Sequence, residues 1–155
     1  MEFTAREDID VPIEQAFEMV TDFEQFERAA LRRGAEVRRL DDLNRPGVGA
    51  KWQVEFKFRG KPREMDLDVT DFDRPNEIKL HAKIQGIESD MKIELVALSR
   101  TRTRINIWTG LSAKTLSARL LLQSLKLARG TLTERLEKRV TAMGRDMEDR
   151  FSRIA

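Results

Sequence analysis

The stretch GAKWQVEFKFRGKPREMDLDV, residues 49–69, alternates apolar with polar side chains in two runs joined by a short turn. Alternation with a period of two is typical of a strand that buries one face. The glycine-containing link at 59–61 favours a hairpin between the two runs. The stretch therefore predicts two antiparallel strands whose apolar faces point inward. The apolar positions of common parity are Trp52, Val54, Phe56 and Phe58, followed by Met65, Leu67 and Val69.

The same period extends in both directions from this hairpin. Residues 35–112 predict about six consecutive strands with short links, which implies an antiparallel meander. Residues 2–10 predict an earlier strand that carries Phe3, Ala5 and Ile9 on one face. Between them, the apolar residues of 12–20 and 22–33 have helical spacing, which predicts two short helices. Pro12 lies at the start of the first helix. Thr21 and Asp22 are caps for the second helix, and Gly34 ends it.

The C-terminal part predicts one long amphipathic helix over about 115–152. Such a helix is roughly 57 Å long, whereas a ten-residue strand reaches only about 33 Å. We therefore expect it to project beyond the sheet or to bend, with Gly130 and Gly144 as the bending points. Its apolar stripe consists of Leu121, Leu125, Ala128, Leu132, Leu136, Val140, Met143, Met147, Phe151 and Ile154.

Composition limits the classes of function. A chain of 155 residues fits one domain over 1–155, and a net charge of +2 predicts no general attraction to nucleic acid. Residues 114–155 are more basic, with ten Lys and Arg against five Asp and Glu. The chain has no cysteine, which is compatible with a cytoplasmic location, and no apolar run long enough for a transmembrane segment.

The order of one strand, two short helices, about six strands and a long helix resembles the START-like or SRPBCC superfamily, also described as Bet v 1-like or polyketide cyclase/dehydrase-like. The resemblance spans the chain and is carried best by IDVPIEQAFEMVTDFEQFE (9–27) and PGVGAKWQVEF (46–56). It implies an α+β helix-grip fold: a curved antiparallel sheet of about seven strands with the C-terminal helix packed on its concave face. It also implies an apolar cavity between sheet and helix.

From this resemblance and the alternation we expect binding of a hydrophobic or amphipathic small molecule, such as a lipid, quinone or polyketide-like compound. A solid core would use the same residue types, so alternation alone does not distinguish a cavity from a core. The predicted lining residues are Trp52, Val54, Phe56, Met65, Leu67, Ile78, Leu80, Ile93, Leu95, Ile107 and Leu125.

The sequence shows no catalytic constellation. His81, the single histidine, has a parity opposite to Leu80 and Ala82 and is expected on the outer face, so no histidine-rich metal site is predicted. No glycine-rich phosphate loop or other cofactor motif is present. The carboxylates Glu64, Asp66 and Asp68 are likewise expected on the outer face, as is Trp108.

Two alternative functions stay open. A cyclase or dehydratase would need a buried acid, base or hydroxyl, for which Glu7 and Thr109 are the candidates, with Arg102 or Arg104 as a partner for Glu7. An interaction module would have a filled core, and its helix beyond about residue 140 would pack on another subunit, as in a homodimer. The basic segment 119–139 packs on the sheet in our interpretation, and transient membrane contact is its alternative.

Overall fold

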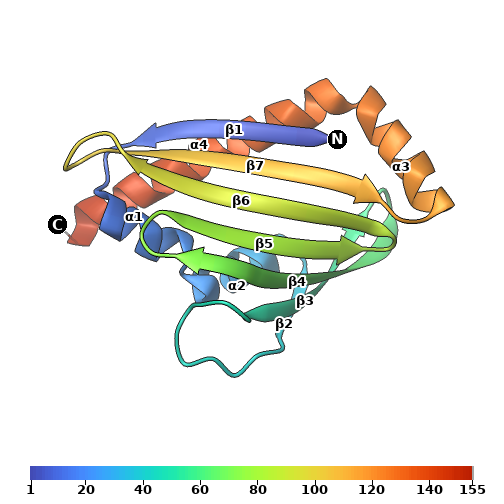
Figure 1. The fold of residues 1–155 in the computed structure, drawn as a ribbon, viewed down its shortest axis with the longest axis horizontal. Coiled ribbons are helices and arrows are strands. Elements are labelled where there is room, and N and C mark those ends of the chain that lie inside the picture. Colours follow the sequence, from blue (N-terminus) through green and yellow to red (C-terminus); the bar gives the residue numbers. More distant parts are fainter. Residues whose placement is uncertain (155) are drawn as a thin grey trace.

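The computed structural model describes residues 1–154, which form a curved seven-stranded antiparallel sheet and four helices (Figure 1). This confirms the predicted α+β helix-grip class. In chain order the elements are β1 (Glu2–Ile9), α1 (Ile13–Val20), α2 (Phe23–Arg32), β2 (Glu36–Arg39), β3 (Lys51–Phe58), β4 (Lys61–Asp73), β5 (Glu77–Ile84), β6 (Ile87–Ala97), β7 (Thr103–Ala113), α3 (Leu116–Leu127) and α4 (Arg129–Ile154).

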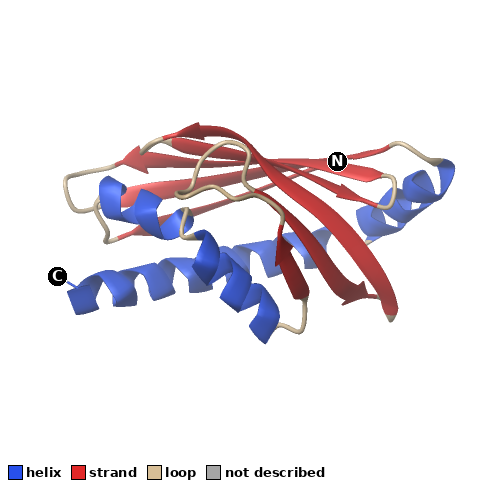
Figure 2. Ribbon diagram, turned by 90° about the horizontal axis from the view of Figure 1, so that it is seen from below, coloured by secondary structure: helices blue, strands red, loops and turns tan. Residues whose placement is uncertain are grey.

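The strands follow the order β1-β7-β6-β5-β4-β3-β2, so the first strand of the chain lies beside the last. The hairpin of β3 and β4 places Phe58 opposite Lys61, and Arg59 and Gly60 turn the chain with positive φ angles of 52° and 73°. The register of β4 shifts between Val69 and Asp71, an irregularity of the kind that bends a strand. Figure 2 shows α2 and α4 together on the concave side of the sheet.

The two short helices begin where the sequence predicted. Pro12 occupies the N-cap position of α1, and the Asp22 carboxylate accepts a hydrogen bond of 3.2 Å from the backbone N–H of Gln25 to cap α2. Thr21, which is buried, donates its hydroxyl to the carbonyl oxygen of Phe17 at 2.7 Å. The tight link between the helices therefore satisfies its own polar groups.

The expected long C-terminal helix is divided into two, because α3 ends at Leu127 and α4 begins at Arg129, so the region bends as its length required. The N–H of Ala128 bonds to the carbonyl of Leu125 at 3.0 Å, which tightens the last turn of α3. Arg129 then donates to the carbonyl of Glu2 at 2.7 Å and lies over the ring of Phe3, so the new helix is fixed to β1. The break lies two residues before Gly130.

Gly144 is not a bending point, contrary to the sequence expectation. It lies inside α4 and is buried. A Cβ atom at this position would come within 2.9 Å of Ile9 and 3.0 Å of Glu7. The missing side chain therefore lets α4 approach β1 closely.

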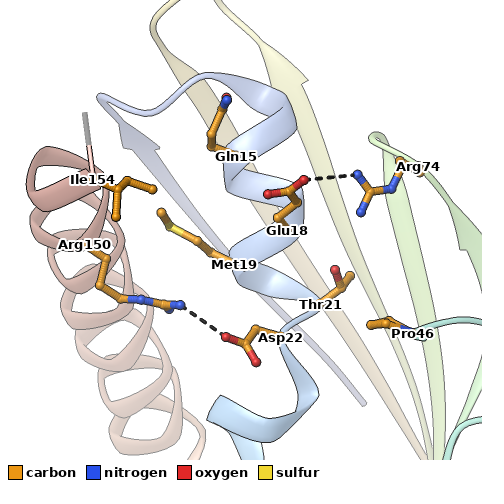
Figure 3. Close-up of a pocket in the computed structure, with 9 residues that line it drawn as sticks. All are labelled: Gln15, Glu18, Met19, Thr21, Asp22, Pro46, Arg74, Arg150 and Ile154. Atoms are coloured by element: carbon orange, nitrogen blue, oxygen red, sulfur yellow. Dashed lines mark hydrogen bonds and ion pairs between the residues drawn. The ribbon is translucent and has the colours of Figure 1, made fainter. Parts of the chain in front are cut away.

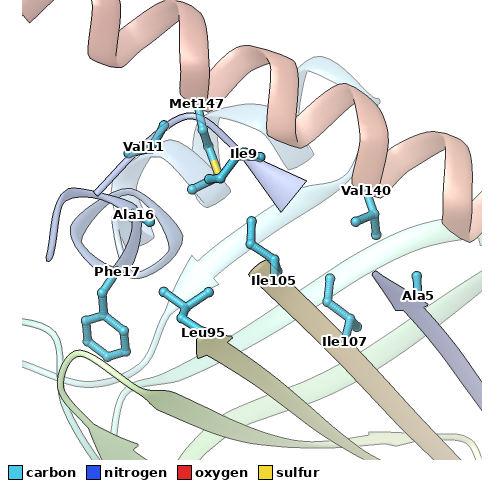
Figure 4. Packing of buried hydrophobic residues seen from close by; sticks show 10 residues of the cluster. All are labelled: Ala5, Ile9, Val11, Ala16, Phe17, Leu95, Ile105, Ile107, Val140 and Met147. Carbon is cyan, nitrogen blue, oxygen red and sulfur yellow. The ribbon is translucent and has the colours of Figure 1, made fainter. Parts of the chain in front are cut away.

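The main core lies between the β1–β7–β6 part of the sheet, α1 and α4 (Figure 4). Met147 is 2% exposed in this core, and Met143 and Phe151 pack against it. In the alternative of an interaction module these residues would pack on another subunit, whereas in the structure they complete the chain's own core. Ile154, by contrast, is 72% exposed.

Candidate functional site

Ten of the eleven predicted lining residues lie on the inner face of the sheet. The strand register places Met65 opposite Val54 and Leu67 opposite Trp52, while Ile93 pairs with both Ile78 and Ile107. Side chains that are opposite each other in an antiparallel pair point to the same face. The alternation in the sequence therefore identified the inner face correctly on β3–β7.

Packing divides these ten residues into two equal groups. The first group is closed off in the core and consists of Trp52, Val54, Ile78, Leu95 and Ile107. The second group is only partly buried and consists of Phe56, Met65, Leu67, Leu80 and Ile93. These five residues pack against the core and are the part of the predicted lining that keeps some exposure to solvent.

Met91 belongs to the same surface but was absent from the predicted lining. It is partly buried and lies opposite Leu80 on one side and Thr109 on the other. Its parity with Ile93 and Leu95 was the signal that could have identified it. We define the inner band as the partly exposed apolar residues of β3–β6, namely Phe56, Met65, Leu67, Leu80, Met91 and Ile93.

Trp52 is a buried core residue, and its indole N–H is already hydrogen-bonded within the protein. Its side chain is 1% exposed, and the rings of Phe23 and Phe26 pack edge-on against it at centroid distances of 4.9 and 5.6 Å. The indole Nε1 donates to Glu27 Oε1 at 3.2 Å. Trp52 therefore anchors α2 to β3, which is the role that core packing requires of a buried tryptophan.

Arg39 connects this aromatic cluster to the loop that leads into β3. Its guanidinium lies over the Trp52 ring at 5.0 Å, and its Nε donates to Asp41 Oδ2 at 2.6 Å. Asp41 also accepts from the backbone N–H groups of Lys51 and Leu43. The Arg39 hydrogen bond, followed by these backbone donors, lowers the pKa of Asp41 to about 2.

Leu125 lies apart from the other ten residues. It packs with Leu122 and Ala118 of α3 against Ile87, in a third apolar cluster at the α3 end of the molecule. Sequence analysis assigned Leu125 to the apolar stripe of one continuous helix. Because the break at Ala128 separates α3 from α4, Leu125 does not lie with the stripe of α4.

Glu7 points to the inner side, as its parity predicted, but its expected partners are wrong. Arg104 bonds to Asp8 at 2.8 Å and Arg102 to Asp10 at 2.9 Å, because both arginines lie on the outer face. Glu7 instead accepts a hydrogen bond of 3.1 Å from the hydroxyl of Thr141. The carboxylate thus links β1 to α4.

The outer face holds His81 and Trp108, in agreement with the prediction. His81 lies between two carboxylates of β6, with Nδ1 2.7 Å from Asp90 and Nε2 3.1 Å from Glu88. The hydrogen bond with Asp90, followed by that with Glu88, raises the pKa of His81. Trp108 lies between Thr4 and Lys92 in the register.

A groove of about 430 Å³ lies at the C-terminal end of α4, beside α1 (Figure 3). Two ion pairs lie on its walls, Arg150–Asp22 at 3.3 Å and Arg74–Glu18 at 3.7 Å. Its lining contains none of the predicted site residues and consists of Gln15, Glu18, Met19, Thr21, Asp22, Pro46, Arg74, Arg150 and Ile154. This groove is therefore distinct from the inner band.

Residues 1–154 contain neither a cluster of metal ligands nor a membrane-spanning helix. No group of three or more histidine, cysteine, aspartate or glutamate side chains in this range is placed to hold a metal ion. None of its helices is both long and apolar enough to cross a bilayer.

Sequence comparison finds no match, neither to a family model nor to a curated protein. Solved structures do match. The Zhui aromatase/cyclase from a Streptomyces species is 13% identical, with 97% of this chain and 95% of that chain covered at a TM-score of 0.69. A protein from Thermus thermophilus is 14% identical, with coverages of 95% and 97% and a TM-score of 0.70.

A START superfamily protein from Mycobacterium smegmatis is 14% identical and matches with a TM-score of 0.57, over 86% of this chain and 95% of that chain. At these identities the likeness concerns the fold and does not transfer an activity. The chain therefore has the START-like, SRPBCC-type helix-grip fold that the sequence resemblance implied.

Proposed function

We propose that the protein binds a hydrophobic or amphipathic small molecule on the inner band. The observation that carries this proposal is the partial exposure of six apolar side chains, contributed by four neighbouring strands, on the concave face of the sheet. Partly exposed apolar residues that adjoin one another form a surface that gains free energy when a ligand covers it.

The size of this gain follows from the apolar area that a ligand would cover. Removal of apolar surface from water contributes roughly 25 cal/mol per Å², so a ligand that buries about 300 Å² would gain ~7 kcal/mol before the costs of association. Aliphatic and thioether side chains adapt to ligands of different shape, and Met65 and Met91 are the most flexible members of the band. We therefore expect selectivity for size and apolar character.

Polar side chains at the edge of the inner band would orient the bound ligand. Thr109 is partly exposed and lies opposite Met91, so its hydroxyl is available to a polar group of the ligand. Glu7 already accepts a hydrogen bond from Thr141 and packs against α4. Binding without chemical conversion is therefore the function that these side chains support best.

Native mass spectrometry of gently purified protein, combined with titration of the apolar dye anilinonaphthalene sulfonate, tests the proposal. Met65→Gln and Met91→Gln keep the side-chain length but make the band polar, and each should weaken dye binding about tenfold. Val96→Gln is the matched control, because Val96 lies on β6 with Met91 but is 41% exposed on the outer face. Dye binding that is equal in all three variants would refute the proposal.

A further inference from the structure

Helix α3 has two apolar faces, of which only one is used by the fold. Ala118 and Leu122 are 2% and 8% exposed and pack toward Ile87. On the other face, Leu116, Leu120 and Leu127 are 74%, 62% and 93% exposed. At 3.6 residues per turn these three leucines lie within about 40° of one another around the helix axis. We call them the outer leucine stripe.

The outer leucine stripe is unusual because the chain's own core covers only the opposite face of α3. A single exposed leucine is ordinary, but three on one side of a short helix form a continuous apolar strip. Figures 1 and 2 both show α3 at the end of the molecule opposite the C-terminus of α4, beyond the ends of the strands. The strip therefore lies where a large flat partner can reach it.

The charge around the stripe identifies the kind of partner. Residues 114–133 contain four basic side chains and no acidic one. Arg119 and Lys126 are exposed, lie on one flank of the stripe, and form no ion pair among residues 1–154. Long basic side chains beside an apolar strip can extend toward anionic groups while the strip is buried.

The tip of the β3–β4 hairpin adds to this charge. Residues 57–63, KFRGKPR, contain four basic side chains and no acidic one. The tip contacts α3 directly, because Arg59 Nη1 donates to Ser124 Oγ at 2.8 Å. We call the two segments 57–63 and 114–133 together the basic end. The acidic Glu88 approaches it and pairs at 3.6 Å with Lys114, which precedes α3, whereas the cations of α3 itself, Arg119 and Lys126, are not part of this pair.

We propose that the basic end docks the protein on an anionic lipid bilayer, with the outer leucine stripe inserted at the level of the acyl-chain boundary. Apolar side chains flanked by lysine and arginine are the composition of helices that lie in the bilayer interface. A polybasic surface is attracted by the negative surface potential of an anionic leaflet. At 12 residues, or about 18 Å, α3 can lie on a bilayer but not cross it. This inference goes beyond ligand binding and does not depend on it.

Co-sedimentation of the full chain with vesicles tests the docking. Vesicles of phosphatidylcholine mixed with phosphatidylserine should bind the protein, vesicles of phosphatidylcholine alone should bind it at least about tenfold less, and added salt should weaken binding. The double variant Leu120→Ser with Leu127→Ser should lose binding about tenfold or more. Leu31→Ser with Val48→Ser is the matched control, since these residues are 55% and 57% exposed elsewhere on the molecule.

A variant that lacks the two cations beside the outer leucine stripe tests the electrostatic part of the proposal. Arg119→Gln with Lys126→Gln should reduce binding about tenfold. Arg100→Gln with Arg153→Gln, which removes two exposed charges outside the basic end, should leave binding unchanged. Equal losses in both variants would mean that only net charge matters and would overturn the proposed site.

Insertion can be observed directly because the chain has no cysteine. An environment-sensitive fluorophore on Leu127→Cys should shift to the blue with phosphatidylserine vesicles, whereas the same label on Leu31→Cys should not. Failure of the protein to bind the mixed vesicles would overturn the proposal. It would equally be overturned if the leucine variant converted a dimer to a monomer in sedimentation while vesicle binding stayed the same, because the stripe would then be covered by a second copy of the chain.

Discussion

His81 is a single outer-face residue whose ionisation should affect the stability of the sheet. Asp90 and Glu88 raise its pKa above that of the unfolded chain. A raised pKa means that the imidazolium stabilises the folded protein below the unfolded pKa of about 6.5, and that this contribution is lost as the pH rises through the folded pKa. Replacement of His81 should therefore destabilise the folded protein more at mildly acidic pH than at alkaline pH.

Thermal unfolding of the wild type and His81→Gln, compared at about pH 6 and about pH 8.5, measures this effect. We expect the melting temperature of the wild type to exceed that of the variant by a larger margin at the lower pH. A margin that is constant or grows with pH would show that the two carboxylates do not stabilise the imidazolium.

Asp41 gives the opposite pH dependence in the loop before β3. Its pKa is lowered to about 2, so its contribution is present above the unfolded value of about 3.9 and is lost as the pH falls through about 2. Asp41→Asn should reduce the free energy of unfolding at neutral pH by roughly 1–2 kcal/mol. Urea unfolding measures this loss, with the exposed neighbour Asp42→Asn as control; equal effects of the two changes would contradict the assigned contacts.

The partner of Glu7 is an example of a contact that could not be predicted from sequence. Glu7 has the parity of Phe3 and Ile9, and Arg104 has that of Trp108, so parity already argued against the pair considered for the enzyme alternative. The actual partner of Glu7, Thr141, lies 134 positions away on α4. Which residue of α4 reaches Glu7 depends on how far this helix is shifted along β1. The local sequence does not indicate that shift.

The two glycines of α4 have different roles, and substitution of each by alanine tests this difference. A Cβ at Gly144 would meet the buried Ile9 within 2.9 Å, whereas a Cβ at Gly130 has no atom within 4 Å. Gly130→Ala should stabilise the protein by up to about 1 kcal/mol through helix propensity. Gly144→Ala should destabilise it by about 1 kcal/mol, because overpacking outweighs the same propensity gain.

Chemical denaturation of both variants provides the measurement. Opposite signs are the expected result. Stabilisation by both substitutions would mean that α4 does not approach β1 closely at Gly144, and the account of this helix would have to be revised.

At the same scale, alternation and caps were sufficient to place every strand and both short helices, because these signals are local. The break at Ala128 was not predictable from periodicity, since the apolar stripe continues across it from Leu125 to Leu132. At the break, Arg129 makes distant contacts with Glu2 and Phe3, which a local pattern cannot encode. The close approach at Gly144 has the same origin in tertiary packing.

For the whole molecule, the order of elements predicted the fold, and the parity of each strand predicted the inner face. Parity does not show how much of that face the helices cover. Trp52 and Leu67 belong to the same face, yet Trp52 is enclosed by α2 and Leu67 is partly exposed. The accessible part of the site therefore had to come from the three-dimensional arrangement, and the ligand itself stays a proposal.

Methyl NMR of the chain's six methionines tests the central proposal most directly, because these residues sample different parts of the molecule. Met65 and Met91 lie in the inner band, Met19 lines the groove beside α1, and Met147 is buried in the main core. On titration with decanoate or anilinonaphthalene sulfonate, we predict saturable shifts of the Met65 and Met91 methyl signals while that of Met147 stays in place. Unchanged signals from Met65 and Met91, or shifts confined to Met19, would contradict ligand binding on the inner band.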